Sequence, residues 1–422
     1  MFTDEDKKIL AALARRVAEI AGDPANEAKR ALWRRHNALK GRRPVIFVHP
    51  DGAWNELLPA SSLLCGDPWA RSIEYDLRQR IIRADVIRDD VPIDKSLPVQ
   101  KTVLTINEGW GLIPEKAFSS NERGAWRFEP VVTAPSDWKK LRKPVLDVDE
   151  TGVLERFEQT RDLLGGMLDV SLTGIKSFSF HMMHLYCDLR GLNEMMMDLV
   201  LEPDMVHDVI SFITEGWREY IAQCVGAELI SLNNDGTFHY TGGIGYTDEL
   251  PRQGGSGEEA RLCDVWAAAE AQEFAQVSPE MHEEFILQYE RKLLEPFGLN
   301  GYGCCDDLTK KLHNVLKIKN LRRISICPWA DVAACASVLK KDYIMSWKPQ
   351  PSYLAMESFD GGLVEEYLFR ELTRAGQGYP EIVLRDTHTC RNEPQRFTEF
   401  VRIARRVIER VYGKDRAERK LP

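Results

Sequence analysis

Residues 299–347 read LNGYGCCDDLTKKLHNVLKIKNLRRISICPWADVAACASVLKKDYIMSW, and the pattern in this stretch decides the fold. Three short apolar segments have the length of buried strands, and the two segments between them carry apolar residues at helical spacing. The strands are 299–303, 323–327 and 343–347, and the helices are 308–316 and 332–339. This alternation predicts parallel strands that are covered by helices.

The same rhythm continues on both sides of that stretch. The further strands are 174–180, 228–232 and 381–385, and the further helices are 153–165, 203–225, 279–294, 362–375 and 394–412. Ser278 is the expected N-cap of the helix that starts at Pro279. Six strand–helix units after residue 170, with room for two more upstream, predict a (β/α)8 TIM barrel. An open doubly wound sheet is the alternative, but no G-x-G-x-x-G motif follows a strand.

The first 150 residues are predicted to form a helical and mixed extension that packs on the barrel. Strand candidates at 44–48 and 99–106 lie in it, and a polar connection at 135–150 ends it. We therefore expect an N-terminal extension over residues 1–150 and a barrel over 151–422, with a barrel start before residue 151 also compatible with the pattern.

Charge and hydropathy limit the class of protein. The chain has 422 residues, 44% of them hydrophobic, and a formal net charge of −9, which argues against a nucleic-acid binder. A basic run at 29–43 (KRALWRRHNALKGRR) is predicted to be a solvated helical face, with anion binding as the alternative. No apolar run reaches the ~18–20 residues that span a bilayer, so no membrane association is expected.

The cysteines indicate the compartment. Nine cysteines, an odd number, argue against a disulfide framework and favour reduced thiols. The N-terminal stretch has the pattern of an amphipathic helix and no signal-peptide core. A cytoplasmic protein is therefore expected.

Reactive side chains gather just beyond the predicted strands. Cysteine, histidine, carboxylate, amide or lysine residues follow each of six strands within a few positions. These segments are 181–188, 233–239, 302–307, 327–331, 346–349 and 386–390. The carboxyl ends of barrel strands form one face, and active sites are built on that face. An enzyme is therefore predicted.

The residue types on that face suggest separate roles. Thiolates favour zinc, and Cys304, Cys305 and Cys390 are the cysteines best placed to bind it, whereas Cys327 ends an apolar strand and is predicted to be core. Carboxylates at strand ends orient a histidine or hold substrate, and serve equally often as turn caps. The glycine-rich segment 242–245 is predicted to be a mobile lid, with 254–257 as its hinge.

The stretch 285–351 resembles the uroporphyrinogen decarboxylase superfamily, which includes corrinoid-dependent methyltransferases such as methylcobamide:coenzyme M methyltransferase. The segment SPEMHEEFILQYERKLLEPFG, followed by YGCCDDL, resembles the helix–strand–HxCG segment of that superfamily. SWKPQP resembles the segment after the penultimate strand, and TCRNEPQRFTEFVRIARRV resembles the C-terminal segment with its helix. The resemblance covers about residues 170–412 and extends loosely to the first 150. It implies a (β/α)8 barrel.

In the thiol-methyltransferase branch the resemblance implies a zinc site made by the histidine and cysteine of HxC and by a later cysteine. Cys304 matches the first cysteine and Cys390 the last, while Tyr302 stands where the family has histidine. Cys305, His388 or His239 could supply the missing ligand. The expected metal ligands are Cys304, Cys305, His388 and Cys390. The expected catalytic residues are Asp235, His239, Tyr302 and Asp386, and the expected cofactor-binding residues are Asn233, Asn234, Trp329 and Lys348.

These residues and the resemblance lead to one leading hypothesis and two alternatives. The leading one is a zinc-assisted methyltransferase that moves a methyl group between a small methoxy, methylamine or thiol compound and a corrinoid (cobalamin). The chain has no D-x-H-x-x-G segment, so a partner corrinoid protein is expected to carry that cofactor. The alternatives are a metal-free decarboxylase that uses Asp235 and Arg385, and a non-catalytic tetrapyrrole-binding protein. A homodimer is compatible with the sequence but not required by it.

Overall fold

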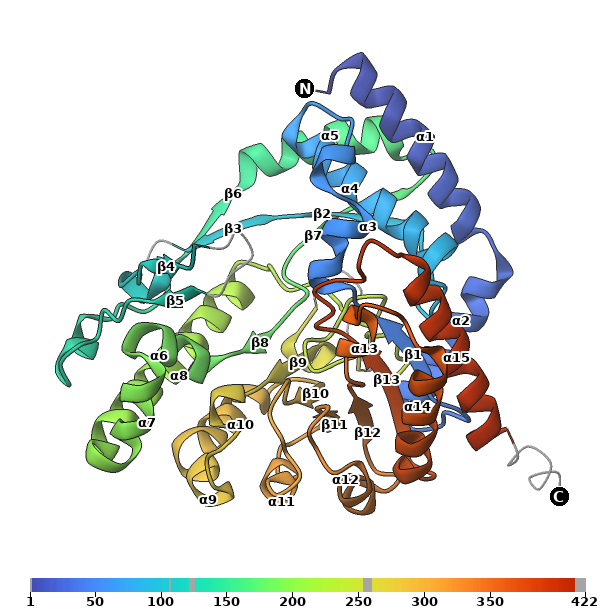
Figure 1. Ribbon diagram of the computed structural model, residues 1–422. Coiled ribbons are helices and arrows are strands. Elements are labelled where there is room, and N and C mark those ends of the chain that lie inside the picture. Colours follow the sequence, from blue (N-terminus) through green and yellow to red (C-terminus); the bar gives the residue numbers. More distant parts are fainter. Residues whose placement is uncertain (1, 106–107, 121–125, 253–259, 414–422) are drawn as a thin grey trace.

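A computed structural model describes residues 2–105, 108–120, 126–252 and 260–413. Its centre is a parallel sheet of seven strands in the order β1-β13-β12-β11-β10-β9-β8 (Figure 1). The strands are β1 (Val45–Val48), β8 (Ser179–Phe180), β9 (Trp266–Ala269), β10 (Leu299–Tyr302), β11 (Leu321–Ile326), β12 (Ile344–Trp347) and β13 (Tyr379–Leu384). The mixed α/β class with a parallel sheet is therefore confirmed.

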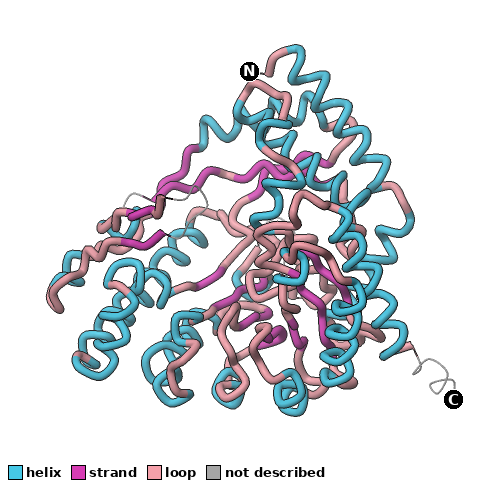
Figure 2. Tube along the Cα trace, viewed as in Figure 1, coloured by secondary structure: helices cyan, strands magenta, loops and turns pink. Residues whose placement is uncertain are grey.

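Helices follow the strands and lie around the outside of the sheet (Figure 2). They are α6 (Met182–Arg190), α7 (Leu192–Leu201), α8 (Pro203–Gly226), α9 (Pro279–His282), α10 (Gln288–Leu294), α11 (Leu312–Val315), α12 (Val332–Leu339), α13 (Ser352–Ala355), α14 (Gly361–Ala375) and α15 (Gln395–Tyr412). Side-chain caps fix where several begin. The Ser278 hydroxyl accepts the Met281 amide at 3.2 Å, as predicted, and Asp331 and Asp360 cap α12 and α14 in the same way.

The sequence predicts the central stretch well and its flanks less well. The strands and helices expected within 299–347 all form, although the helix expected at 308–316 shortens to α11. The strand expected at 228–232 is reduced to a single parallel bridge between Ile230 and Ile175. The described sheet thus has seven strands where eight were predicted. At its other edge, the Asp90 amide donates to the Ile46 carbonyl at 3.0 Å, which extends hydrogen bonding beyond β1.

One strand of the central sheet was not predicted, and outside that sheet β4 to β7 were not predicted either. Trp266–Ala269 forms β9 and pairs with both β8 and β10. Its sequence, WAAA, is rich in alanine, which favours helix when it is read in isolation. Tertiary burial overrides that preference, because all four residues are buried within the sheet.

The residues before position 150 form a helical and mixed region with a strand in the main sheet. Its elements are α1 (Asp4–Ala21), α2 (Pro24–Asn37), α3 (Trp54–Leu57), α4 (Pro68–Ile82), β2 (Ser96–Gln100), β3 (Thr102–Thr105), β4 (Lys116–Phe118), β5 (Trp126–Phe128) and β6 (Leu146–Asp149), followed by α5 (Glu150–Leu164) and β7 (Asp169–Thr173). The strand expected at 99–106 is divided between β2 and β3, with Ile106 outside the described residues. β1 comes from this region and pairs with β13.

The two faces of the central sheet differ in chemistry. Alternate residues of β11, β12 and β13 point under the helices and belong to the main hydrophobic core; these are Ile324, Ile326, Met345, Trp347, Ile382 and Leu384. The residues between them and directly after them point to the inner face and are mostly polar; these are Arg323, Ser325, Ser346, Lys348, Glu381 and Arg385. Full burial of each large apolar side chain is worth roughly 1.5–3 kcal/mol, so the helix-covered face holds the sheet together.

A buried ion pair occupies the inner face. Arg323 Nε lies 3.0 Å from Glu381 Oε1, and both side chains are fully buried. His36 Nε2 lies 3.3 Å from Glu381 Oε2, and Arg323 donates to the Asn37 amide oxygen at 2.7 Å. Burial alone would raise the pKa of Glu381, but the charge of Arg323, together with His36 and Ser346, lowers the pKa of this carboxyl to about 2.

The expected lid is instead part of this interior. Residues 241–247 are buried, and a Cβ atom on Gly242 would lie 1.9 Å from Ser346 Oγ. A Cβ atom on Gly243 would lie 2.7 Å from Glu381 Oε2. The glycines therefore permit close backbone approach to the polar face, which corrects the interpretation of this segment as a mobile lid. The hinge expected at 254–257 lies outside the described residues.

No helix among the described residues is both long enough and apolar enough to cross a membrane.

Candidate active site

A turn after β10 places two thiols at the carboxyl end of the sheet. Gly303 adopts a φ of 87°, a conformation that favours glycine, and the chain then bends through Cys304 and Cys305. The Cys304 amide donates to Asp306 Oδ1 at 3.1 Å, and the Cys304 carbonyl accepts the Ser325 hydroxyl at 2.5 Å. Hydrogen bonds on both sides thus fix the backbone of Cys304.

The two sulfur atoms lie 3.5 Å apart. Cys304 is 2% exposed, while Cys305 is open to solvent and has its Sγ 3.8 Å from Asp386 Oδ2. The hydrogen bond from the Cys305 thiol is the largest influence on Cys304 and lowers its pKa to about 7, with Lys348 and Arg385 acting in the same direction against burial. The same hydrogen bond raises the pKa of Cys305. Cys304 is therefore the thiol that ionises first.

Two cations from neighbouring strands face the Cys304 thiol. Lys348 follows β12, is buried, and donates to the Thr241 carbonyl at 2.8 Å and to the Ser325 hydroxyl. Burial lowers the pKa of Lys348, and the negative charge on Cys304 opposes that shift. Arg385 follows β13 and donates to the Tyr240 carbonyl at 3.3 Å. Burial opposes the charge of Arg385, but Cys304 and neighbouring carboxylates raise its pKa overall.

A histidine, a carboxylate and a tyrosine complete the cluster. His181 Nδ1 lies 2.6 Å from Oε1 of Glu270, which is buried directly after β9. The His181 ring meets the Tyr240 ring edge-on at 4.2 Å, and the Tyr240 hydroxyl hydrogen-bonds the side chain of Cys304. Burial, and then the negative charges of Cys304 and Glu270, raise the pKa of Tyr240. We call these residues, with the thiols and cations, the strand-end cluster: His181, Tyr240, Glu270, Cys304, Cys305, Lys348, Arg385 and Asp386.

Five of the residues predicted from sequence thus come together: Cys304, Cys305, Lys348 and Asp386, and Arg385 from the decarboxylase alternative. Glu270 and Tyr240 were missed. Glu270 is the first charged residue after β9, so recognising the strand in WAAAE would have found it by the strand-end rule. Tyr240 had no such signal, because its position depends on the buried course of residues 241–247.

Asn233, Asn234 and Asp235, which were also predicted as site residues, lie outside the strand-end cluster. The Asn233 side chain donates to the carbonyls of Lys176 and Trp266, at 2.8 and 3.0 Å, and accepts the Trp266 amide at 2.9 Å. The Asn233 side chain thereby forms hydrogen bonds to the backbone that a neighbouring strand would otherwise form, at the place where residues 228–232 make only one bridge. The Asn234 side chain donates to the Leu250 carbonyl at 2.7 Å. Asp235 is ion-paired with Lys176, which lowers its pKa against burial.

Asp235 and Lys176 also line a cavity of about 330 Å³. Its other walls come from α4, which contributes Arg80, from Arg83 just after that helix, and from residues 91–98, which include Asp94. The cavity therefore lies between the N-terminal region and the segment that follows the Ile230 bridge.

His239 and Tyr302 have separate environments. His239 is buried with its ring 4.9 Å from that of Trp266, and burial, with help from Arg323, lowers its pKa to about 3. Tyr302 belongs to the helix-covered core, and its hydroxyl lies 2.9 Å from His282 Nε2 and donates to Glu290 Oε2 at 2.7 Å. Strand alternation turns Tyr302 to the opposite face from Gly301 and away from the inner polar residues.

The remaining predicted residues lie on the segments after β11 and β13. Cys390 is buried, and its thiol donates to Glu56 Oε2 at 3.2 Å. His388 is exposed and packs beside Gly52, where an added Cβ would lie 3.0 Å from His388 Nδ1. Trp329 is 71% exposed after β11. The structure therefore does not place Cys390 or Trp329 in hydrogen-bonding contact with the thiol pair.

This arrangement fits zinc only in part. Two sulfurs on a tetrahedral zinc ion stand about 3.7 Å apart, because each Zn–S bond is about 2.3 Å long. The Cys304–Cys305 separation of 3.5 Å is close to that value. Within the described ranges, however, no group of three or more His, Cys, Asp and Glu side chains is arranged to hold a metal ion. The four expected ligands are thus not assembled, and the thiol pair supplies two of them.

The electrostatics of the cluster give a direct prediction. The difference in absorbance at 240 nm between metal-free wild type and metal-free Cys304→Ser, followed against pH, is expected to show a thiolate titration with its midpoint near 7. Lys348→Met should move that midpoint upward, because it removes a positive charge beside the sulfur. Lys341→Met, an exposed lysine in the α12–β12 turn, is the matched control. A midpoint unaffected by Lys348→Met would refute the contribution assigned to Lys348.

Comparisons with known proteins support the fold. Neither a protein-family model nor a curated protein sequence matches the chain. Among solved structures, a methyltransferase from Methanosarcina mazei is similar over 90% of this chain and 98% of its own, with a TM-score of 0.50 and 10% sequence identity. At that identity the likeness concerns the fold.

Proposed function

We propose that this protein is a methyltransferase that moves a methyl group between a small methoxy, methylamine or thiol compound and a corrinoid carried by a partner protein. The observation that carries the proposal is the Cys304–Cys305 pair beside Lys348 and Arg385, at the carboxyl end of a parallel sheet. The likeness in fold to a methyltransferase supports it. We further propose that residues 228–232, through the Ile230–Ile175 bridge, complete an eight-stranded barrel.

The residues of the strand-end cluster suit a methyl transfer in which a negatively charged atom has to be stabilised close to the Cys304 sulfur. A methyl group passes from a donor atom to an acceptor atom, and the donor keeps the electron pair of the broken bond. Lys348 and Arg385 favour anions beside Cys304, so they would stabilise either an acceptor thiolate or a departing phenolate. Because burial keeps water away from these charges, their effect is larger than on an open surface.

The His181–Glu270 pair can hold or deliver a proton in this reaction. Glu270 lies 2.6 Å from Nδ1 of His181, which fixes the ring and leaves Nε2 for exchange with a substrate. The histidine is partly exposed, while Glu270 is buried. A methoxy or methylamine donor would require such a proton at its leaving atom, whereas a thiol acceptor would give one up.

Zinc and the corrinoid are parts of the proposal that need their own tests. Cys304 and Cys305 would hold the zinc ion, with Asp386 as the nearest further donor to Cys305, and a bound ion would supply Lewis-acid activation of a thiol or leaving group. The partner's corrinoid would supply or accept the methyl group. The exposed ring of Trp329 offers an aromatic contact at this end of the sheet.

The test combines a reaction with a metal analysis. The purified protein is incubated with methylcobalamin and a panel of small thiols, and demethylation of the cobalamin is followed by visible absorbance. We expect turnover, with bound zinc in the wild type that is lost in Cys304→Ser. A metal-free wild type with full activity would remove zinc from the proposal. Turnover of a porphyrinogen without any corrinoid would favour the decarboxylase instead.

A further inference from the structure

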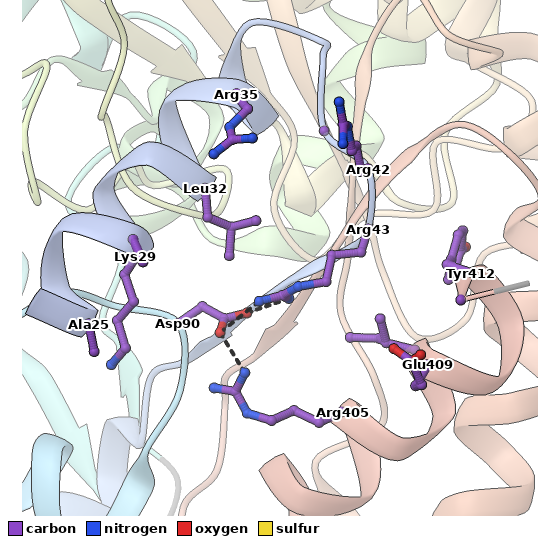
Figure 3. A pocket seen from close by; sticks show the side chains of 14 residues that line it. Ala25, Lys29, Leu32, Arg35, Arg42, Arg43, Asp90, Arg405, Glu409 and Tyr412 are labelled. Carbon is purple, nitrogen blue, oxygen red and sulfur yellow. Dashed lines mark hydrogen bonds and ion pairs between the residues drawn. The ribbon is translucent and has the colours of Figure 1, made fainter. Parts of the chain in front are cut away.

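A second cavity, of about 380 Å³, lies where β1 begins, at the other end of that strand from the strand-end cluster. α2, the loop of residues 38–44 and the last turns of α15 form its walls (Figure 3). Several residues of the basic run 29–43, which was noted in the sequence analysis, line this cavity. The proposed methyl transfer does not involve the cavity.

The walls of this cavity carry an excess of positive charge. Five cationic side chains line it, against two carboxylates. The cations are Lys29, Arg35, Arg42, Arg43 and Arg405, and the carboxylates are Asp90 and Glu409. The four arginines stay protonated at any physiological pH. The whole chain has a net charge of −9, so this local excess is opposite in sign to the protein as a whole.

Asp90 organises two of the arginines. Arg43 Nη1 lies 2.9 Å from one oxygen of the buried Asp90 carboxylate, and Arg405 Nη1 lies 2.8 Å from the other (Figure 3). The same carboxylate accepts the Ile46 amide of β1 at 3.0 Å. Because each guanidinium has five N–H donors, these bonds position both groups and leave further donors on each.

The other two arginines are not neutralised. Arg35 donates to the Ala31 carbonyl of its own helix at 3.3 Å, and within the described part of the chain neither Arg35 nor Arg42 forms an ion pair. Both are exposed at the cavity and free to turn towards a ligand. Leu32, Ile408 and Tyr412 give the cavity an apolar wall between the charges.

We propose that this cavity binds a small phosphate ester, with the phosphate between the arginines and an apolar or aromatic body against Leu32, Ile408 and Tyr412. A guanidinium group can donate two parallel hydrogen bonds to two oxygens of one phosphate group. The excess of three positive charges also favours a ligand with two negative charges over a carboxylate with one. The cavity volume lies within the range of small-molecule sites, about 300–1,000 Å³. The bound ester would act at a distance from the strand-end cluster, as an effector rather than as the methyl substrate.

The test uses phenyl phosphate as the probe, measured by isothermal titration calorimetry at low ionic strength. Saturable binding is expected, tighter than that of benzoate or inorganic phosphate. The double variant Arg35→Gln/Arg42→Gln should weaken it by about a hundredfold, because two charge-assisted hydrogen bonds are lost at about tenfold each. Arg34→Gln/Lys40→Gln is the matched control, because it removes the same charge from the same helix and loop outside the cavity walls.

Several results would overturn the proposal. These are the absence of saturable binding by the wild type, equal weakening in the two double variants, and equal affinity for benzoate. Tighter binding of an oligonucleotide or an anionic vesicle, lost in Arg35→Gln/Arg42→Gln, would replace the small ester with that macromolecule. Because binding is measured without turnover, these outcomes are independent of the methyl-transfer proposal.

Discussion

Glu381→Leu is expected to lower the free energy of unfolding by about 3–5 kcal/mol, because it leaves the Arg323 charge buried without its partner. Arg323 and Glu381 are both fully buried, and no solvent is available to compensate the orphaned guanidinium. Urea denaturation followed by far-UV circular dichroism measures the loss as a shift in midpoint at constant slope.

The double variant Arg323→Met/Glu381→Leu separates this cause from a simple packing defect. It removes both charges, so much of the stability should return. Glu365→Leu is a surface control, because Glu365 and its partner Arg406 are both partly exposed to solvent, and less than about 1 kcal/mol should be lost. A double variant as unstable as Glu381→Leu would show that shape rather than charge is responsible.

The lowered pKa of Glu381 also leads to a prediction of how the free energy of unfolding depends on pH. The pKa of Glu381 in the folded protein, about 2, lies below the ordinary value of 4.5. Ionised Glu381 therefore stabilises the fold above pH 4.5, and this contribution falls as the pH drops towards 2. The acid limb of a stability–pH curve should be shallower in Arg323→Met/Glu381→Leu than in the wild type.

Cys304→Ala is expected to reduce kcat/KM for the proposed methyl transfer by about 10³-fold, an effect comparable with the loss of a main electrostatic group in an active site. Cys304 is the thiol that ionises first, and both Lys348 and Arg385 act on it. Demethylation of methylcobalamin in the presence of a thiol acceptor measures the effect.

Cys390→Ala is the matched control for this prediction. It deletes the same atom from a buried cysteine, but the Cys390 thiol is bound to Glu56 rather than to the cluster. We expect less than about threefold loss of activity and about 1 kcal/mol loss of stability from the broken hydrogen bond. If Cys390→Ala were as inactive as Cys304→Ala, the site would contain Cys390, as the family resemblance implies.

The sequence predicts those parts of the fold in which local preference and burial agree. In residues 299–347, the spacing of apolar residues and the length of the apolar segments both point to the same elements, and those elements form. β9 was missed because its alanines favour helix in isolation, while its burial comes from strands distant in sequence. The segment 242–245 was wrongly predicted to be a mobile lid because its glycines were taken as a sign of mobility, whereas Gly242 permits close approach to Ser346.

The candidate site was predictable to a similar degree and for similar reasons. The rule that reactive residues follow strands located Cys304, Lys348 and Asp386, because these positions depend only on strand ends. It could not decide to which face Tyr302 points, nor that the thiol of Cys390 would be held by Glu56. Those outcomes depend on side-chain direction and on contacts between distant segments.

The chemical contrast between the two faces of the central sheet also constrains how the strands align during folding. If β12 slipped by one residue, Met345 and Trp347 would turn towards Arg323 and Glu381, and Ser346 would be forced beneath the helices. Such a misaligned sheet would put apolar side chains beside Arg323 and Glu381 and would turn Lys348 towards the helices. The same misalignment would cost less free energy if the inner face carried only valine and leucine. The charged residues on the inner face therefore favour the correct strand alignment, even where they add little to the stability of the folded protein.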